Sequence, residues 1–210
     1  MPSCAFKLVE KGKGVKMQSL KDEEIMLMYK NGQVEAMDEL LLRYKKPICA
    51  FAFRLINDTA EAEDISQEVF LRLHQSKDRY SADGKFSTWI FTIAHHLCIS
   101  RLRKKKWFVL WPRKSHDSED LKDFASTNPS PQEASAKNDT QEIVKKCINS
   151  FPLLQREALI LREYENLDYM EISKILNKSQ GTIKTLIYRA RQNLKTKLLV
   201  FVKESGGEYV

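Results

Sequence analysis

The sequence predicts an all-α protein, in which two small helical domains are joined by a flexible linker. Apolar residues recur at helical spacing through most of the chain, and no segment shows a convincing strand pattern. The helical pattern stops between residues 112 and 138, where three prolines lie among Ser, Asp and Asn. Such a segment is too long for a loop inside a compact domain, so it is predicted to separate two domains.

Composition narrows the class of protein further. The chain has 210 residues, of which 42% are apolar and 30% charged, with a formal net charge of +7. That is a globular composition. The apolar run 198–202 is far shorter than the ~20 residues of a membrane span, and no signal peptide is evident. We therefore expect a cytoplasmic protein without membrane insertion.

The cysteines indicate neither a disulfide framework nor a metal centre. They occupy positions 4, 49, 98 and 147, and no two of them form a Cys-x-x-Cys pair. His95 and Cys98 have helical spacing, but no further His or Cys cluster completes a ligand set. Reduced thiols, no metal and no cofactor are expected.

The first domain is predicted over residues 22–111, after a flexible tail over 1–21. Met17 follows a Lys-Gly-Lys-Gly run, which a purine-rich ribosome-binding site would encode, so Met17 is a second candidate for the start. Asn-Gly at 31–32 marks a turn, and Pro47 predicts a kink or short break in its helix. The expected helices are 22–30, 33–56, 59–74 and 86–106.

After the linker over 112–138, a second domain is predicted over 139–203, followed by a tail over 204–210. Its helical pattern begins at Thr140. Further along, Asp168 and Glu171 have the spacing of a capping box. The short helix that they start ends at Asn177, a residue that tolerates the left-handed conformation, and Ser179 can cap the next helix. A short helix, a tight turn and a longer helix predict a helix-turn-helix.

The second helix of this motif has two contrasting faces. The apolar face carries Ile183, Ile187, Ala190 and Leu194. The opposite face and its flanks are basic and rich in hydroxyl and amide groups. This arrangement suits a helix that reads base edges in the major groove and holds phosphates with Lys and Arg.

Positive charge is concentrated in two segments, 85–114 and 174–203. Each contains eight Lys or Arg and no acid, so together they carry +16 while the remaining 150 residues carry −9. One basic segment lies in each predicted domain. Two separate contacts with a polyanion are therefore indicated.

Two features of the first domain have more than one interpretation. The helix over 59–74 carries an acidic stripe with Leu71, which is either a solvated face or a docking surface for a basic partner. The basic segment contains many aromatics, which suit stacking on single-stranded nucleic acid. For Phe86 and Trp89, helical spacing favours packing in the core.

Three segments in this order resemble the extracytoplasmic-function (ECF) sigma factors, a two-domain group of RNA polymerase sigma factors. They are EAEDISQEVFLRL (61–73), KFSTWIFTIAHHLCISRLRKKK (85–106) and LLQREALILREYENLDYMEISKILNKSQGTIKTLIYRARQNLK (153–195). The resemblance extends from about Asp22 to Leu198.

This resemblance implies a protein that binds core RNA polymerase, recognises two promoter elements and promotes DNA melting. The first domain would match sigma region two, dock on the clamp helices of the largest polymerase subunit, and hold an unstacked base of the non-template strand. The second would match region four and read duplex minus-35 DNA, while the linker would thread near the active-site cleft. An anti-sigma factor is the implied regulatory partner.

The resemblance assigns site residues to three surfaces. The polymerase-binding residues would be Glu61, Asp64, Gln67, Glu68 and Leu71. The minus-ten DNA residues would be Lys85, Ser87, His95, His96, Arg101, Arg103 and Lys104. The minus-35 DNA residues would be Ser179, Gln180, Thr182, Lys184, Thr185, Tyr188, Arg189 and Arg191.

The chain departs from the family pattern at several of these positions. Relatives often have Ala-Arg-Asn where this chain has Ala94-His95-His96, which affects the melted base and suggests pH-sensitive opening. Relatives also often have Asp in place of Ser100. Gln180 and Leu186 depart from the usual residues in the minus-35 reading helix, so the promoter sequence is left open.

Two other classes compete with this interpretation. A helix-turn-helix regulator that acts without polymerase accounts for the second domain, but leaves the acidic helix and the long linker without a role. An enzyme would need a phosphate-binding Gly loop, a metal triad or a nucleophile elbow, none of which is found in the sequence.

Overall fold

The computed structural model describes residues 17–110 and 137–204, and every regular element in these two ranges is helical. The predicted all-α class, with two helical domains, is confirmed. The N-terminal domain contains a 3-10 turn Met17–Ser19 and the helices α1 (Asp22–Lys30), α2 (Glu35–Ile56), α3 (Thr59–Ser76) and α4 (Phe86–Leu110), with a second 3-10 turn at Lys77–Arg79. The C-terminal domain contains α5 (Lys137–Asn149), α6 (Leu153–Glu163), α7 (Tyr169–Leu176) and α8 (Gln180–Glu204).

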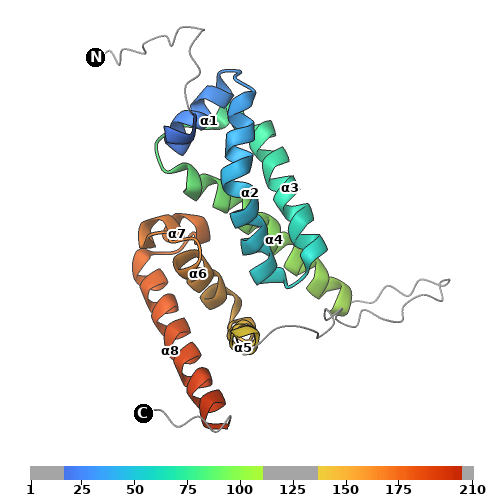
Figure 1. Cartoon of the computed structure of the whole chain (residues 1–210), viewed down its shortest axis with the longest axis vertical. Coiled ribbons are helices and arrows are strands. Elements are labelled where there is room, and N and C mark those ends of the chain that lie inside the picture. Colours follow the sequence, from blue (N-terminus) through green and yellow to red (C-terminus); the bar gives the residue numbers. More distant parts are fainter. Residues whose placement is uncertain (1–16, 111–136, 205–210) are drawn as a thin grey trace, which may run out of the picture.

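The N-terminal domain is a bundle in which α2 packs against α1, α3 and α4 (Figure 1). Its core is apolar, and the largest side chains in it include Phe51 and Phe86, both fully buried. Trp89 packs at the edge of this core, with its ring 5.1 Å from that of Tyr80 and 6.0 Å from that of Phe86. The expectation that Phe86 and Trp89 pack in or against the core is therefore confirmed.

The helix boundaries of this domain follow local chemistry. Asn57 ends α2 with a left-handed φ of 58°, and the Asp58 carboxylate caps α3 by accepting from the Glu61 N–H at 3.1 Å. The break expected at Pro47 is absent, because α2 runs unbroken through it. Ile48, Phe51 and Ala52 in the following turn are fully buried, and this tertiary packing outweighs the lost backbone hydrogen bond.

The last residues of the predicted N-terminal tail, which was expected over 1–21, are structured. Met17–Ser19 forms a 3-10 turn because Arg43 of α2 donates to the carbonyls of Met17 and Leu20, at 2.8 and 3.0 Å. Asp22 adds to these contacts with α2, since its carboxylate accepts from Arg43 at 2.6 Å and from the Tyr44 hydroxyl. Residues 1–16, including the region before the candidate start at Met17, lie outside the described residues.

The C-terminal domain is organised around α6 and α8. The buried side chains of α6 include Leu159 and Ile160, and they pack against the buried face of α8. Helix α5 begins at Lys137, earlier than the Thr140 expected from the apolar pattern. Most of the predicted linker, residues 111–136, lies outside the described residues.

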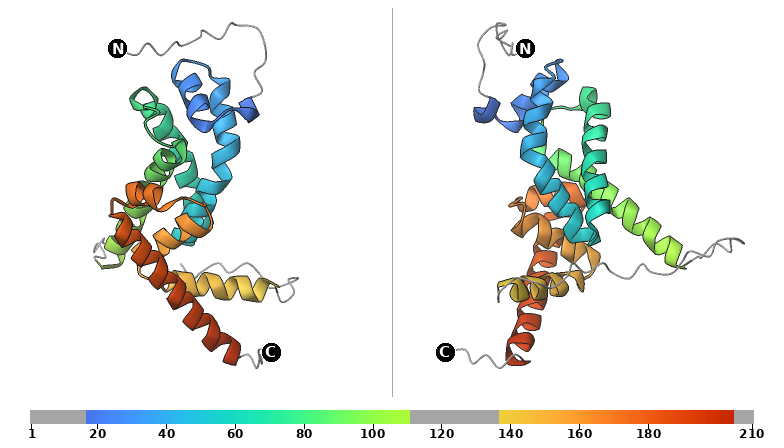
Figure 2. Two further views of the ribbon diagram at one scale, coloured as in Figure 1. Left: turned by 90° about the vertical axis from the view of Figure 1, so that its left-hand side faces the viewer. Right: turned by 45° about the vertical axis from the view of Figure 1, so that its right-hand side comes forward.

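The two domains contact each other (Figure 2). Helix α4 packs against α7, and α2 packs against α5 and α6. Among the described residues, no helix is both long and apolar enough to span a membrane. Cys49, Cys98 and Cys147 are free thiols, while Cys4 is outside the described residues. Burial, reinforced by the charge of Glu157, raises the pKa of Cys98 to about 12, so this thiol stays protonated.

Candidate nucleic-acid and protein interfaces

The turn between α7 and α8 has the geometry that the sequence predicts. Asp168 and Glu171 form the capping box, with the Asp168 N–H donating to Glu171 at 2.9 Å and the Glu171 N–H donating to Asp168 at 2.8 Å. Asn177 adopts a left-handed φ of 50°, and the Ser179 hydroxyl accepts from the Thr182 N–H at 3.2 Å. These local contacts orient α8 relative to α7 as a helix-turn-helix requires.

Helix α8 separates its residues onto two faces as expected. Ile183, Ile187 and Ala190 are buried against the rest of the domain. All the residues assigned to minus-35 DNA are exposed on the other side: Ser179, Gln180, Thr182, Lys184, Thr185, Tyr188, Arg189 and Arg191. Tyr188 is 64% exposed, which is unusual for an aromatic ring in a small domain and leaves it free to meet a partner.

Arg191 differs from the other residues of this exposed face. Its guanidinium donates twice to Oε1 of Glu163 at the end of α6, at 3.0 and 2.5 Å. The hydrogen bond to Glu163 raises the pKa of Arg191. Arg191 is therefore tied to α6 by this ion pair.

On the acidic stripe of α3, some of the assigned residues are free and others are held in ion pairs. Asp64, Gln67 and Leu71 are exposed, and Leu71 has 58% of its surface accessible. Glu61 pairs with Arg101 of α4 at 3.0 Å, and Glu68 pairs with Arg72 at 2.9 Å. The stripe thus retains one unpaired carboxylate, that of Asp64, among these three described acids, beside an exposed apolar side chain.

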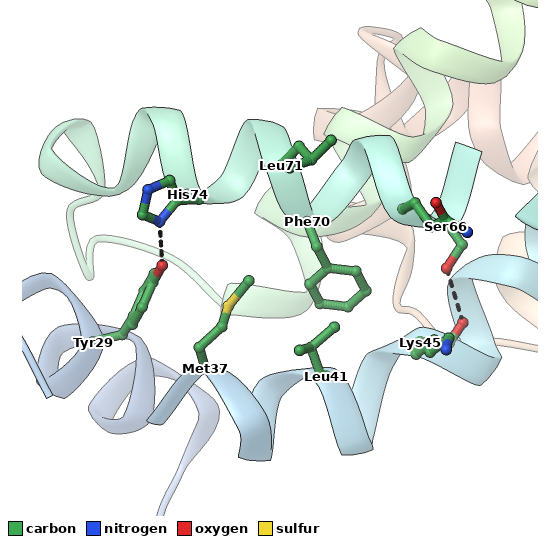
Figure 3. Close-up of a pocket in the computed structure, with 9 residues that line it drawn as sticks. Tyr29, Met37, Leu41, Lys45, Ser66, Phe70, Leu71 and His74 are labelled. Atoms are coloured by element: carbon green, nitrogen blue, oxygen red, sulfur yellow. Dashed lines mark hydrogen bonds between the residues drawn. The ribbon is translucent and has the colours of Figure 1, made fainter. Parts of the chain in front are cut away.

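A groove of about 400 Å³ lies between α2 and α3 next to this stripe (Figure 3). Phe70 points into it toward Leu41 and Met37, whereas Leu71 lies on the outer side of α3. At one end, the Tyr29 hydroxyl is hydrogen-bonded to Nδ1 of His74. The groove and Leu71 together form an apolar surface bordered by Gln67.

The residues assigned to minus-ten DNA do not form one open surface. Lys85, Ser87 and His95 contact the C-terminal domain, while Arg101 is paired with Glu61. His96, Arg103 and Lys104 are exposed. Partial burial, with the nearby charges of His95 and Arg72, lowers the pKa of His96, so its neutral form is favoured.

Sequence reasoning missed the acids that meet these α4 residues. Glu157 on α6 is completely buried, with Oε1 3.4 Å from Nδ1 of His95. Glu171 is identified by its spacing as a capping residue, but it also lies 3.1 Å from Nζ of Lys85. For Glu157 the signal in the sequence is an acid directly before the buried run Ala158–Leu161. Its partner was not predictable from that position.

The comparisons with known proteins agree with this two-domain arrangement. The Sigma-70 region 2 family matches residues 40–108, and the Sigma-70, region 4 family matches residues 141–194. These matches define a sigma-70-type transcription initiation factor. The region 2 match lies in the N-terminal domain, and the region 4 match lies in the C-terminal domain.

Individual relatives indicate which group of sigma factors the chain belongs to. The chain is 31% identical to the ECF RNA polymerase sigma factor SigW of Bacillus subtilis, over 80% of this chain and 92% of that protein. It is 28% identical to the RNA polymerase sigma-H factor of Pseudomonas aeruginosa, over 88% of this chain and 97% of that protein. The protein belongs to the ECF sigma factors; it binds core RNA polymerase and promoter DNA.

Solved structures share the fold. The sigma factor RpoE of Bartonella quintana, in complex with the anti-sigma factor NepR, gives a TM-score of 0.62 at 26% identity, covering 78% of this chain and 96% of that one. CnrH, solved with the cytosolic domain of CnrY, gives a TM-score of 0.65 at 17% identity, covering 85% of this chain and 97% of that one.

Proposed function

We propose that α8 reads the minus-35 promoter element through the eight residues of its exposed face. The observation that carries this proposal is that Gln180, Lys184 and Tyr188 and the other assigned residues are all exposed, while the apolar face is buried. Residues at the start of a helix in the major groove reach base edges, and Lys or Arg further along hold phosphates. The C-terminal domain, residues 139–203, is the minus-35 domain in this proposal.

The N-terminal domain, residues 22–111, engages the minus-ten element and the core enzyme. His96, Arg103 and Lys104 offer an exposed basic surface on α4, to which Lys85, Ser87, His95 and Arg101 are added once their present partners are released. Holding an extruded base of the melted strand offsets an unstacking cost of a few kcal/mol.

Core polymerase docks on the acidic stripe of α3. Asp64 and Gln67 present polar contacts, and Leu71 supplies an apolar anchor beside the groove between α2 and α3. Exposed acids next to an apolar anchor favour a basic partner with a matching apolar residue. The clamp helices of the largest polymerase subunit are the proposed partner, with Glu61 and Glu68 at the edge of the contact.

The proposed protein catalyses no reaction itself. It acts in the cytoplasm. Catalysis of transcription belongs to the polymerase, so we propose a non-enzymatic initiation factor that needs no cofactor. An anti-sigma factor is the proposed regulator, supported by the resemblance of this fold to RpoE, which was solved with NepR.

Run-off transcription tests the proposal. Core polymerase from the same organism is assayed with and without this protein, on DNA from upstream of its own gene, and complex formation with core is measured in the same tube. A transcript that depends on the protein, and that is lost with Arg103→Ala plus Lys104→Ala, supports the assignment. A protein that binds DNA but not core overturns it in favour of a regulator that acts without polymerase.

A further inference from the structure

Helix α1 lies against the segment that joins α3 to α4 and contacts both of its ends (Figure 1). Nζ of Lys30, the last residue of α1, donates to the Tyr80 carbonyl at 2.8 Å. Oε1 of Glu23, in the first turn of α1, accepts from the Phe86 N–H at 2.8 Å. The five residues between these two contacts form the 81–85 loop, and every one of them is exposed.

The contact with Glu23 supplies what the start of α4 lacks. The first N–H groups of an α-helix have no partner within the helix. Lys85 directly precedes α4 and its ammonium has no acceptor, while the first turn of α4 contains no acid. Glu23 therefore accepts from the start of α4 although it belongs to another helix. Its negative charge is also favourable at that end of the helix.

The other end of the loop is fixed by packing as well as by Lys30. The Tyr80 side chain is 3% exposed, and its ring lies 6.1 Å from that of Phe86 in a T-shaped arrangement. The ring of Tyr44 on α2 lies 5.1 Å from Phe86 on another side. Both ends of the 81–85 loop are therefore anchored in one aromatic cluster, whereas the loop itself is not packed into the core.

The two polar contacts come from one rigid element. Glu23 and Lys30 lie on the same face of α1, because seven residues make close to two helical turns, and they are about 10 Å apart along its axis. Ile25 and Met26 between them are fully buried and fix α1 in the core. The two ends of the loop therefore cannot move independently of each other.

A loop held in this way loses less conformational freedom when it binds a partner than a loop with free ends. The 81–85 loop ends at Lys85, which is assigned to minus-ten DNA and begins the basic segment 85–114. The match to the Sigma-70 region 2 family begins at residue 40, beyond α1, so it gives α1 no role.

We propose that Glu23 and Lys30 are positioning residues for promoter recognition, because α1 holds both ends of the 81–85 loop and thereby presents Lys85 to the melted strand. Neither residue needs to touch DNA in this role. The inference rests on the proposed assignment of Lys85 and the start of α4 to minus-ten DNA.

The first experiment compares two pairs of variants of the full chain. Glu23→Ala removes the acceptor for the Phe86 N–H, whereas Glu23→Gln keeps an oxygen that accepts from it, and both change the net charge equally. Lys30→Met removes the donor to Tyr80 but keeps the length of the side chain. Its control for charge is Lys46→Met, at an exposed lysine of α2. Binding of a labelled, randomised single-stranded 12-mer is measured by anisotropy.

We expect Glu23→Ala to bind about threefold more weakly than Glu23→Gln, and Lys30→Met about threefold more weakly than Lys46→Met. The reason is that a freed loop must be ordered when the oligonucleotide binds. Equal affinities within each pair would overturn the positioning role and would assign any change to net charge. Circular dichroism checks folding, and the Lys30 pair decides the question if Glu23→Ala does not fold.

Lys85→Ala separates this inference from the assignment on which it rests. If Glu23 acts by positioning Lys85, Glu23→Ala should have little further effect in a chain that already carries Lys85→Ala. Losses that simply add contradict the positioning role. A Lys85→Ala chain that binds as tightly as wild type would instead overturn the assignment of the start of α4 to minus-ten DNA.

Amide hydrogen exchange measures the order of the loop directly. The Phe86 N–H, which Glu23 holds in the wild-type chain, should exchange faster in Glu23→Ala, together with the amides of residues 81–85. Exchange in α2 should stay as in wild type, and Glu23→Gln should restore slow exchange at Phe86. Exchange over 81–86 that is the same in wild type and Glu23→Ala would contradict the proposal.

Discussion

Glu171 serves two structures at once. One oxygen, Oε2, accepts from the backbone N–H of Asp168 at 2.9 Å and lies 3.1 Å from the Lys85 ammonium, which belongs to the other domain. The residue that helps to cap the first helix of the helix-turn-helix is therefore also the main acid in the domain contact. This double role links the capping of α7 to the docking of α4.

The two roles of Glu171 can be separated by substitution. Glu171→Ala removes the acceptor for the Asp168 N–H and the contact with Lys85, whereas Glu171→Gln keeps that acceptor. We expect the alanine variant to be less stable than the glutamine variant by about 1 kcal/mol, the usual worth of a cap. Urea unfolding followed by circular dichroism measures this difference. Equal midpoints would mean that the capping hydrogen bond adds nothing to stability.

Arg191 provides a test of the minus-35 face. Arg191→Ala should weaken duplex binding about equally for all sequences, and the slope of log affinity against log salt should fall by roughly one. Glu163→Gln is the matched variant, since it frees the guanidinium from its ion pair. It should leave binding equal or tighter. A change in sequence preference in the alanine variant would identify Arg191 as a reader of bases.

The stripe on α3 predicts how the protein meets polymerase. Asp64→Lys combined with Glu68→Lys should abolish co-purification with core enzyme, because a basic partner surface is then opposed by like charge. Duplex DNA binding by α8 should persist. Asp83→Lys with Glu142→Lys makes the same change in net charge at exposed acids outside α3 and should retain core binding. Co-purification of the stripe variant at the wild-type level would exclude this docking surface.

Glu165 predicts a pH-dependent contribution to stability. Burial, partly offset by Arg54, raises the pKa of Glu165 to about 7 in the folded protein. Its protonated form therefore stabilises the fold below the ordinary carboxyl pKa near 4.5, and this contribution is lost as the pH rises through about 7. At pH 8 the folded protein carries a buried carboxylate that it disfavours.

Glu165→Gln removes this cost. The variant should be more stable than wild type at pH 8, by up to about 3 kcal/mol, and the gain should vanish near pH 4.5. Thermal unfolding at a series of pH values measures the difference. Other titratable pairs, including His95 with Glu157, are common to both proteins and cancel in the comparison. A gain that is independent of pH would show that folding leaves the pKa of Glu165 unchanged.

Local chemistry explains why much of the fold was predictable. Asn57 and Asn177 end helices in the left-handed conformation, and Asp58 and Asp168 cap the helices of their own domains through neighbours three residues away. These interactions involve residues close in the sequence, so their spacing alone identifies them. Pro47 is the counterexample. Its residue type predicts a break in the helix, but tertiary packing keeps α2 unbroken.

The candidate sites also differ in how far the sequence could predict them. The exposed face of α8 follows from helical periodicity, and every residue predicted for it is exposed. The availability of the α4 residues does not follow from periodicity. Lys85 and His95 are engaged by acids that come more than sixty residues later in the chain, and Arg101 is engaged by Glu61 of α3.

The sequence by itself determined the all-α class, the helix-turn-helix and the exposed polar face of α8, since each depends on periodicity and on contacts within a few residues. Only the tertiary structure decided which charged residues are free. An ion pair such as Lys85–Glu171 depends on how two domains approach each other, and spacing within either domain carries no information about that approach.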